Sequence, residues 1–111
     1  MAANYARVSK TPFLGICLGL QIATIEFCRN VLGLQGANST EFDSDTPHPA
    51  VVFMPEISKT HLGGTMRLGS RPTIFQVDDC MTRRLYGGGS QVDERHRHRY
   101  EVNPCLLYTS P

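Results

Sequence analysis

Apolar residues in the first third of the chain change their spacing twice, and each change predicts a different element. The alanine-rich residues 2–10 favour a helix, which Thr11-Pro12 ends because the residue before a proline avoids helical geometry. Residues 13–16 form an apolar run of the kind found in a buried parallel strand. From residue 18 to 32, apolar side chains recur every three or four positions, which predicts an amphipathic helix closed by Gly33.

Two charged residues of that helix, Glu26 and Arg29, lie off its apolar stripe and are expected to face water. Polar residues then dominate positions 34–49, which predicts a long loop. The remaining expected elements are a strand at 50–54, a bend at 63–69 leading into a strand, a strand at 73–77, a turn at 78–79, a short helix at 80–86 with Met81 and Leu85 buried, a flexible loop at 87–90 and a strand at 94–103.

Cys17 stands where the predicted strand meets the predicted helix, with Gly15 and Gly19 two residues to either side. This G-x-C-x-G spacing is the cysteine counterpart of the G-x-S-x-G turn that holds a catalytic serine at a strand–helix corner. Glycines let such a turn bend tightly and let the two backbones pass close together. A helix N-terminus also favours a thiolate over a thiol. The pattern indicates a nucleophilic cysteine, and a small buried core cysteine is the alternative.

Within the segment 94–103, arginine and histidine alternate at residues 95–99. On a strand this places Arg95, Arg97 and Arg99 on one face and His96 and His98 on the other. Such a row of arginines indicates recognition of carboxylate or phosphate, or simply a charged edge strand. The histidines are not expected to bind a metal, because no matching Cys or His pair lies at a usual spacing.

Composition and charge narrow the class of protein. A chain of 111 residues is one small domain or part of a larger one, and 41% hydrophobic with 19% charged residues is a globular balance. A net charge of +1 argues for neither nucleic acid nor an anionic membrane as partner, and we expect neither. We find no span long enough for a bilayer and no secretory signal peptide. The 4 cysteines have no disulfide-like spacing, so we expect reduced thiols in a cytoplasmic protein.

Four stretches taken together resemble the glutaminase domain of the CTP synthase family. They are residues 12–21 (PFLGICLGLQ), 37–42 (ANSTEF), 63–69 (GGTMRLG) and 94–104 (ERHRHRYEVNP). The cysteine turn by itself would indicate only the class-I glutamine amidotransferases, whereas the other three stretches are specific to the CTP synthase family. The resemblance implies an α/β fold of flavodoxin-like type, with an open, mostly parallel sheet and helices on both faces, here incomplete.

The resemblance also implies an activity. Enzymes of this family convert UTP, ATP and glutamine into CTP, in pyrimidine nucleotide biosynthesis. An amidoligase domain phosphorylates UTP with ATP and Mg²⁺, and the glutaminase domain supplies ammonia internally. Members form homotetramers, and many polymerise into filaments. The present chain is therefore expected to hold no cofactor or metal of its own, since ATP and Mg²⁺ belong to the amidoligase domain.

Particular residues match the family's functional positions. Cys17 matches the nucleophile that forms a glutamyl thioester, and the Leu18 backbone N–H matches a donor of the oxyanion hole. Glu41 matches the carboxylate that binds the α-amino group of glutamine, which replaces the simpler interpretation of its loop as a solvated acidic surface. The full set of matched glutamine-contacting positions is Leu18, Gly19, Leu20, Gln21, Glu41, Arg99 and Tyr100.

The chain also departs from the family. The general-base histidine and its orienting glutamate lie in a His-Pro-Glu motif that does not occur here, and His48 is not assigned because Ala50 follows Pro49. The Gly-rich turn that supplies a second oxyanion donor is absent. We expect a partial amidotransferase domain over residues 1–104, a non-matching, artefactual tail over 105–111, and no activity from this polypeptide alone. The alternative is an inactive glutaminase-like module that binds glutamine or docks a regulatory partner.

Overall fold

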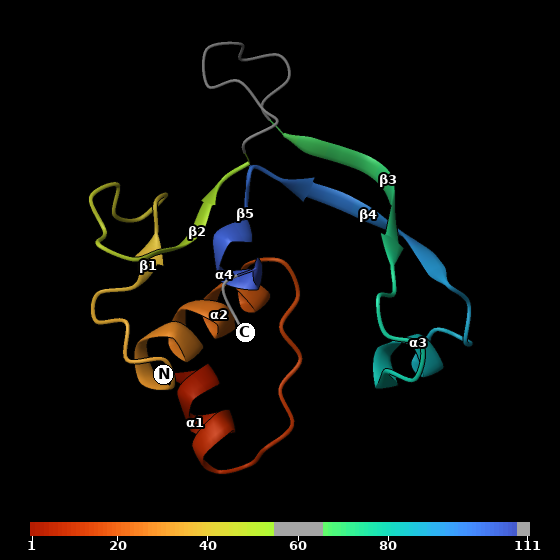
Figure 1. Cartoon of the computed structure of the whole chain (residues 1–111), viewed down its shortest axis with the longest axis horizontal. Coiled ribbons are helices and arrows are strands. Elements are labelled where there is room, and N and C mark those ends of the chain that lie inside the picture. The colour runs from red at the N-terminus through yellow and green to blue at the C-terminus, as the bar shows by residue number, and fades with distance from the viewer. Residues whose placement is uncertain (55–65, 109–111) are drawn as a thin grey trace.

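The computed structural model describes residues 1–54 and 66–108 (Figure 1). The glycines at 63–64, Thr65 and residues 109–111 of the predicted tail lie outside the described residues. The elements are α1 (Ala2–Val8), α2 (Leu18–Asn30), β1 (Asn38–Ser39), β2 (Pro49–Phe53), β3 (Arg67–Ile74), α3 (Met81–Leu85), β4 (Gln91–His98), β5 (Tyr100–Val102) and α4 (Pro104–Tyr108).

β2 is the centre of a three-stranded sheet with the order β1-β2-β5. β1 runs parallel to β2, so the loop predicted at 34–49 contains a short strand. β5 runs antiparallel to β2, with Phe53 opposite Tyr100. Because β1 and β2 end at the same edge of the sheet and β5 begins there, this edge collects the residues that follow Ser39 and those around Tyr100.

The core lies between α2 and this sheet. Ile25 and Cys28 of α2 are buried against Ala37, Ala50 and Val51. Burial raises the pKa of the Cys28 thiol, so Cys28 serves as a small apolar side chain of the core. A helix packed on an open sheet of mixed pairing is the α/β arrangement that the sequence predicts.

Gly33 closes the end of α2, as predicted. Its φ is +70°, in the left-handed region that glycine adopts without strain. The Leu34 backbone N–H then donates to the Cys28 carbonyl at 2.9 Å and satisfies one of the last carbonyls of the helix. The helix itself stops at Asn30, slightly before the predicted end at residue 32.

α1 lies against α2 and is held there by Glu26. Arg7 Nη2 lies 2.8 Å from Glu26 Oε1, and the side-chain amides of Asn4 and Asn30 donate to the same oxygen at 2.9 and 3.0 Å. The hydrogen bonds from Arg7 and Asn4 lower the pKa of Glu26 to about 2. The prediction that Glu26 faces water is therefore wrong, because α1 covers it, whereas Arg29 is exposed as predicted.

β3 and β4 form an antiparallel hairpin that extends away from the β2 sheet (Figure 1). The strand predicted at 73–77 is wrong in position, because pairing with β4 sets its bounds at Arg67–Ile74. Met81 and Leu85 of α3 were expected to be buried, yet they are 70% and 80% exposed. α3 lies at the far end of the hairpin, where the core cannot cover it.

The buried strand predicted at 13–16 does not form. Residues 11–16 adopt no regular structure, and Phe13, Leu14 and Ile16 are 45%, 83% and 75% exposed. A parallel strand needs neighbours to pair with its backbone, and none of the strands in the described residues lies beside this segment. Residues 13–16 are apolar as a buried strand requires, but no strand of the described residues pairs with them.

Candidate active site

Cys17 is the N-cap residue of α2 and has a backbone conformation that L-residues rarely adopt. Its φ and ψ are 54° and −110°. Such a conformation costs on the order of 1–3 kcal/mol and persists only where the surrounding structure imposes it. It turns the chain sharply from residues 11–16 into the helix, which is the tight turn that the G-x-C-x-G spacing predicts.

The two glycines beside Cys17 differ in what they allow. A Cβ on Gly15 would lie 2.7 Å from the Gly19 carbonyl carbon and 2.8 Å from the Leu20 nitrogen, inside the helix backbone. A Cβ on Gly19 would meet no atom within 4 Å. The close approach of the two backbones therefore requires glycine at position 15 only.

The Cys17 side chain is exposed and makes no capping hydrogen bond to α2, the helix that begins at the next residue. The Gly19 N–H donates to the Ile16 carbonyl at 3.0 Å, and the Gln21 N–H donates to the Cys17 carbonyl at 3.2 Å. Leu18 is the first helical residue, so its N–H has no carbonyl partner within the helix. This N–H and the positive end of the helix dipole can stabilise an oxyanion that forms on a group attached to Cys17.

Gln21 and Tyr100 are brought together from distant parts of the sequence. The Gln21 Nε2 donates to the Tyr100 carbonyl oxygen at 3.0 Å. The Tyr100 ring packs edge-on against Phe53, with ring centroids 5.5 Å apart. This places the first turns of α2 at the edge of the sheet where β2 ends and β5 begins.

Glu41 and Arg99 lie at the same sheet edge without touching the cysteine turn. Glu41 follows β1 in a turn, where its N–H donates to Ser39 Oγ at 3.2 Å. Arg99 occupies the bend between β4 and β5, and its carbonyl accepts from the Met54 N–H at 3.0 Å. Both side chains are exposed, and no hydrogen bond or ion pair joins either of them to Cys17 in the described part of the chain.

His96 and His98, which the sequence analysis did not assign to the site, are connected to it through Tyr100. His96 Nδ1 lies 2.9 Å from His98 Nε2, and His98 Nδ1 lies 2.9 Å from the Tyr100 carbonyl oxygen. Burial lowers the pKa of His96, and electrostatic interaction with His98, Arg67 and Arg71 lowers it further, against an opposite effect of Glu94. The period-two alternation of the strand was the available signal, since it puts residues 96, 98 and 100 on one side.

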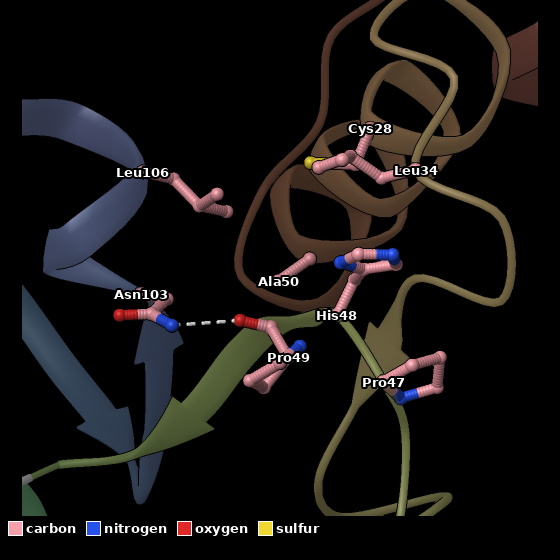
Figure 2. A pocket seen from close by; sticks show the side chains of 8 residues that line it. All are labelled: Cys28, Leu34, Pro47, His48, Pro49, Ala50, Asn103 and Leu106. Carbon is pink, nitrogen blue, oxygen red and sulfur yellow. Dashed lines mark hydrogen bonds between the residues drawn. The ribbon is translucent and has the colours of Figure 1, made fainter. Parts of the chain in front are cut away.

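His48 lies at the opposite edge of the sheet, just before β2. One strand length, about 13 Å at 3.3 Å per residue, separates the two edges. A cavity of ≈ 110 Å³ opens beside His48, and Figure 2 shows that its walls come from the far end of α2, the start of β2 and α4. None of the predicted site residues lines it. Its lining residues are Cys28, Leu34, Pro47, His48, Pro49, Ala50, Asn103 and Leu106.

The described residues contain no metal-binding cluster, no disulfide and no helix that could span a membrane. No three His, Cys, Asp or Glu side chains gather there as a metal site would require. The 4 cysteines, all of them described, form no disulfide. None of the helices seen in residues 1–54 and 66–108 is both long and apolar enough to cross a bilayer.

Comparison with known proteins gives a consistent answer. The family model described as glutamine amidotransferase class-I matches residues 1–110. Human CTP synthase 1 is 59% identical over 103 residues, which are 93% of this chain and 17% of the relative. The CTP synthase of Dictyostelium discoideum is 63% identical over 111 residues, covering 96% of this chain and 20% of the relative. This chain thus spans about a fifth of the length of these curated relatives.

A solved structure is similar over nearly the whole chain. It is titled "Trypanosoma brucei CTPS - glutaminase domain with bound acivicin", and it superposes with a TM-score of 0.88. The sequences are 37% identical, and the match covers 96% of this chain and 40% of that chain. The fold class predicted from the sequence is therefore confirmed. The chain belongs to the class-I glutamine amidotransferase family, and its similarity within that family is to the glutaminase domain of CTP synthases.

Proposed function

We propose that this chain is the glutamine-binding, nucleophile-bearing part of a CTP synthase glutaminase domain. The observation that carries the proposal is Cys17, an exposed thiol on a strained turn at the N-terminus of α2. The carbonyl of Tyr100 and the side chain of Gln21 meet beside this turn. The edge to which β1 and β2 point their carboxyl ends is also where α/β proteins bind their ligands.

In the proposed reaction, the Cys17 thiolate attacks the side-chain amide carbon of glutamine. A C–S bond forms, and the carbonyl oxygen becomes an oxyanion that accepts a hydrogen bond from the Leu18 N–H. The C–N bond then breaks, and the nitrogen leaves as ammonia after taking up a proton. Water later cleaves the glutamyl thioester to release glutamate and the thiol.

Substrate binding would use both charged ends of the amino acid. The Glu41 carboxylate suits the α-ammonium group, and the Arg99 guanidinium suits the α-carboxylate through paired hydrogen bonds. Leu18, Gly19, Leu20, Gln21 and Tyr100 would line the pocket around the side-chain amide. Because Glu41 and Arg99 are exposed, they would order around the substrate when it binds.

The rest of the proposed enzyme lies beyond what this chain carries. Repeated turnover needs a base to move the protons of the thiol and of the attacking water, and the His-Pro-Glu motif that would provide it does not occur among the 111 residues. UTP and ATP with Mg²⁺, the amidoligase partner domain, homotetramer assembly, filaments and a cytoplasmic location are proposed from the similarity to CTP synthases. No nucleic acid or membrane partner is proposed.

Covalent labelling tests the pocket directly. The 111-residue chain is treated with acivicin, the compound named for the trypanosomal structure, and labelled peptides are mapped by mass spectrometry. We expect one adduct, on Cys17, that excess glutamine suppresses. Cys105 is also exposed and serves as an internal control, since an unselective electrophile would modify both thiols.

The outcomes separate the proposed enzyme part from other roles. Labelling of Cys17 and Cys105 at equal rates, unaffected by glutamine, would contradict the proposed pocket. Glutamine binding by calorimetry without an adduct on Cys17 would instead favour the binding module. Cys17→Ser should lose the adduct while keeping the fold, since the two side chains differ by one atom.

A further inference from the structure

A single carbonyl oxygen joins the nucleophile's helix to the β4 strand. The Tyr100 oxygen accepts from Gln21 Nε2 at 3.0 Å, and it also lies 2.9 Å from His98 Nδ1. His98 Nε2 in turn lies 2.9 Å from His96 Nδ1, with the two rings 5.2 Å apart. The chain of contacts therefore runs from His96 through His98 and Tyr100 to Gln21.

When both rings are neutral, the chemistry of the partners fixes where the protons lie. A carbonyl oxygen can only accept, so His98 Nδ1 must carry a hydrogen. In a neutral imidazole the other nitrogen is then an acceptor, and His96 Nδ1 must donate to it. This leaves His96 Nε2 without a hydrogen, and that atom is buried with no hydrogen-bond partner in the described residues.

The surroundings of His96 favour its neutral form. On β3, Arg67 stands opposite His98, and Arg71 stands opposite Glu94, the strand neighbour of His96 on the same face. The two guanidinium groups disfavour an added positive charge on His96, although Arg67 is itself paired with Glu101 at 3.3 Å. Glu94 acts in the opposite direction, and its carboxylate is engaged by Thr73 and Tyr86. Burial of His96 acts in the same direction and is the largest cause of its lowered pKa.

We propose that His98, with its proton fixed by His96, is a positioning residue for Gln21. By donating to the Tyr100 carbonyl, it holds this peptide group in the bend after β4. The same oxygen accepts a hydrogen bond from the Gln21 amide nitrogen. Gln21 Oε1 therefore faces away from Tyr100 and serves as an acceptor for a ligand N–H. The inference rests on the proposed glutamine pocket only for its effect on labelling; the proton arrangement stands independently.

The first test reads the proton positions and needs no ligand. Nitrogen-15 NMR of the imidazole rings in the 111-residue chain should show His96 and His98 both protonated at Nδ1. A free imidazole in water prefers hydrogen on Nε2, so the expected result differs from that of an unconstrained side chain. Protonation of His98 at Nε2, or averaged signals from both forms, would overturn the proposal.

Variants of His98 then test the link to Gln21. His98→Asn keeps an amide N–H in the place of Nδ1, whereas His98→Leu removes the donor. Arg97→Leu is the matched control, because Arg97 is exposed on the opposite face of the same strand. The Gln21 side-chain amide signals should shift in His98→Leu only. Unchanged signals in that variant would overturn the proposal.

The labelling of Cys17 supplies the functional readout. Loss of the hydrogen bond from His98 to the Tyr100 carbonyl should slow the acivicin reaction of His98→Leu by roughly three- to tenfold. His98→Asn should react at nearly the wild-type rate. The iodoacetamide reaction, which needs no pocket, should keep its rate in all variants. An unaltered acivicin rate in His98→Leu, with wild type labelled, would overturn the positioning role. Absence of labelling in wild type would refute the proposed function alone. The NMR results would still decide whether His98 carries its proton on Nδ1 and holds Gln21 in place.

Discussion

At the scale of single residues, the site depends on how Cys17 is forced into a positive φ. The strain cannot come from Cys17 itself, because a cysteine in isolation prefers negative φ. It comes from the crossing of residues 11–16 over the first turn of α2, where Gly15 lies directly against the Gly19 and Leu20 backbones. Gly15 therefore allows the tight turn that exposes the Cys17 thiol, although glycine has no reactive side chain of its own.

Replacement of Gly15 by alanine should therefore disturb the turn. The new methyl group would lie 2.7 Å from a helix backbone carbon, which cannot move aside as a side chain could. We expect a loss of roughly 1–3 kcal/mol in the free energy of unfolding, measured by urea denaturation.

The matched control for that experiment is Gly19→Ala. There the methyl group meets open space, and alanine favours the helix by about 1 kcal/mol over glycine. Gly19→Ala should equal or exceed wild type in stability. A Gly15→Ala protein as stable as Gly19→Ala would show that the close approach does not matter.

At the scale of elements, α1 is held by polar contacts more than by buried area. Only Ala3 and Ala6 of α1 are buried, and both are small. Against them stands one carboxylate on α2, Glu26, with hydrogen bonds from Arg7 and Asn4 of α1. The attachment of α1 should therefore respond to the ionisation of Glu26.

Acid should release this attachment in a defined window. The pKa of Glu26 is lowered to about 2 in the folded chain, below its ordinary value of about 4.3, so the unfolded state binds a proton first. The stabilisation is complete above about pH 4.5 and is lost as the pH falls toward 2. We expect the unfolding midpoint of wild type to drop across this window more steeply than that of Glu26→Gln, as followed by circular dichroism.

The partner variant provides the control for this pH dependence. Arg7→Met removes the largest cause of the lowered pKa, so it should flatten the same acid limb. The effects of Arg7→Met and Glu26→Gln should not add in the double variant. Additive effects, or an acid limb in Glu26→Gln as steep as in wild type, would contradict the role of this carboxylate.

At the scale of the whole molecule, local features were predictable and distant pairings were not. The tight turn at Cys17, the closure of α2 by Gly33 and the alternating faces of β4 each depend on backbone geometry over a few residues. The bond between Gln21 and Tyr100 joins residues 79 positions apart, and no spacing in the sequence encodes it. The strand expected at 13–16 failed for the same reason, because a strand forms only where another pairs with it.

The last prediction concerns the chain as a catalyst. A nucleophilic cysteine needs one group to remove its proton and to activate water, and a carboxylate to orient that group. His48 is separated from the Cys17 edge by the length of β2. His98 contacts the Tyr100 carbonyl through Nδ1 and His96 through Nε2, so both of its nitrogens are engaged. We therefore expect ammonia release from glutamine by the 111-residue chain to equal that of Cys17→Ala, measured by a coupled glutamate dehydrogenase assay. Turnover near that of an intact CTP synthase, abolished in Cys17→Ala, would contradict this prediction. It would mean that a histidine acts as the base, either one of these three or His61, which lies outside the described residues. Substitution of each histidine in turn would then identify it.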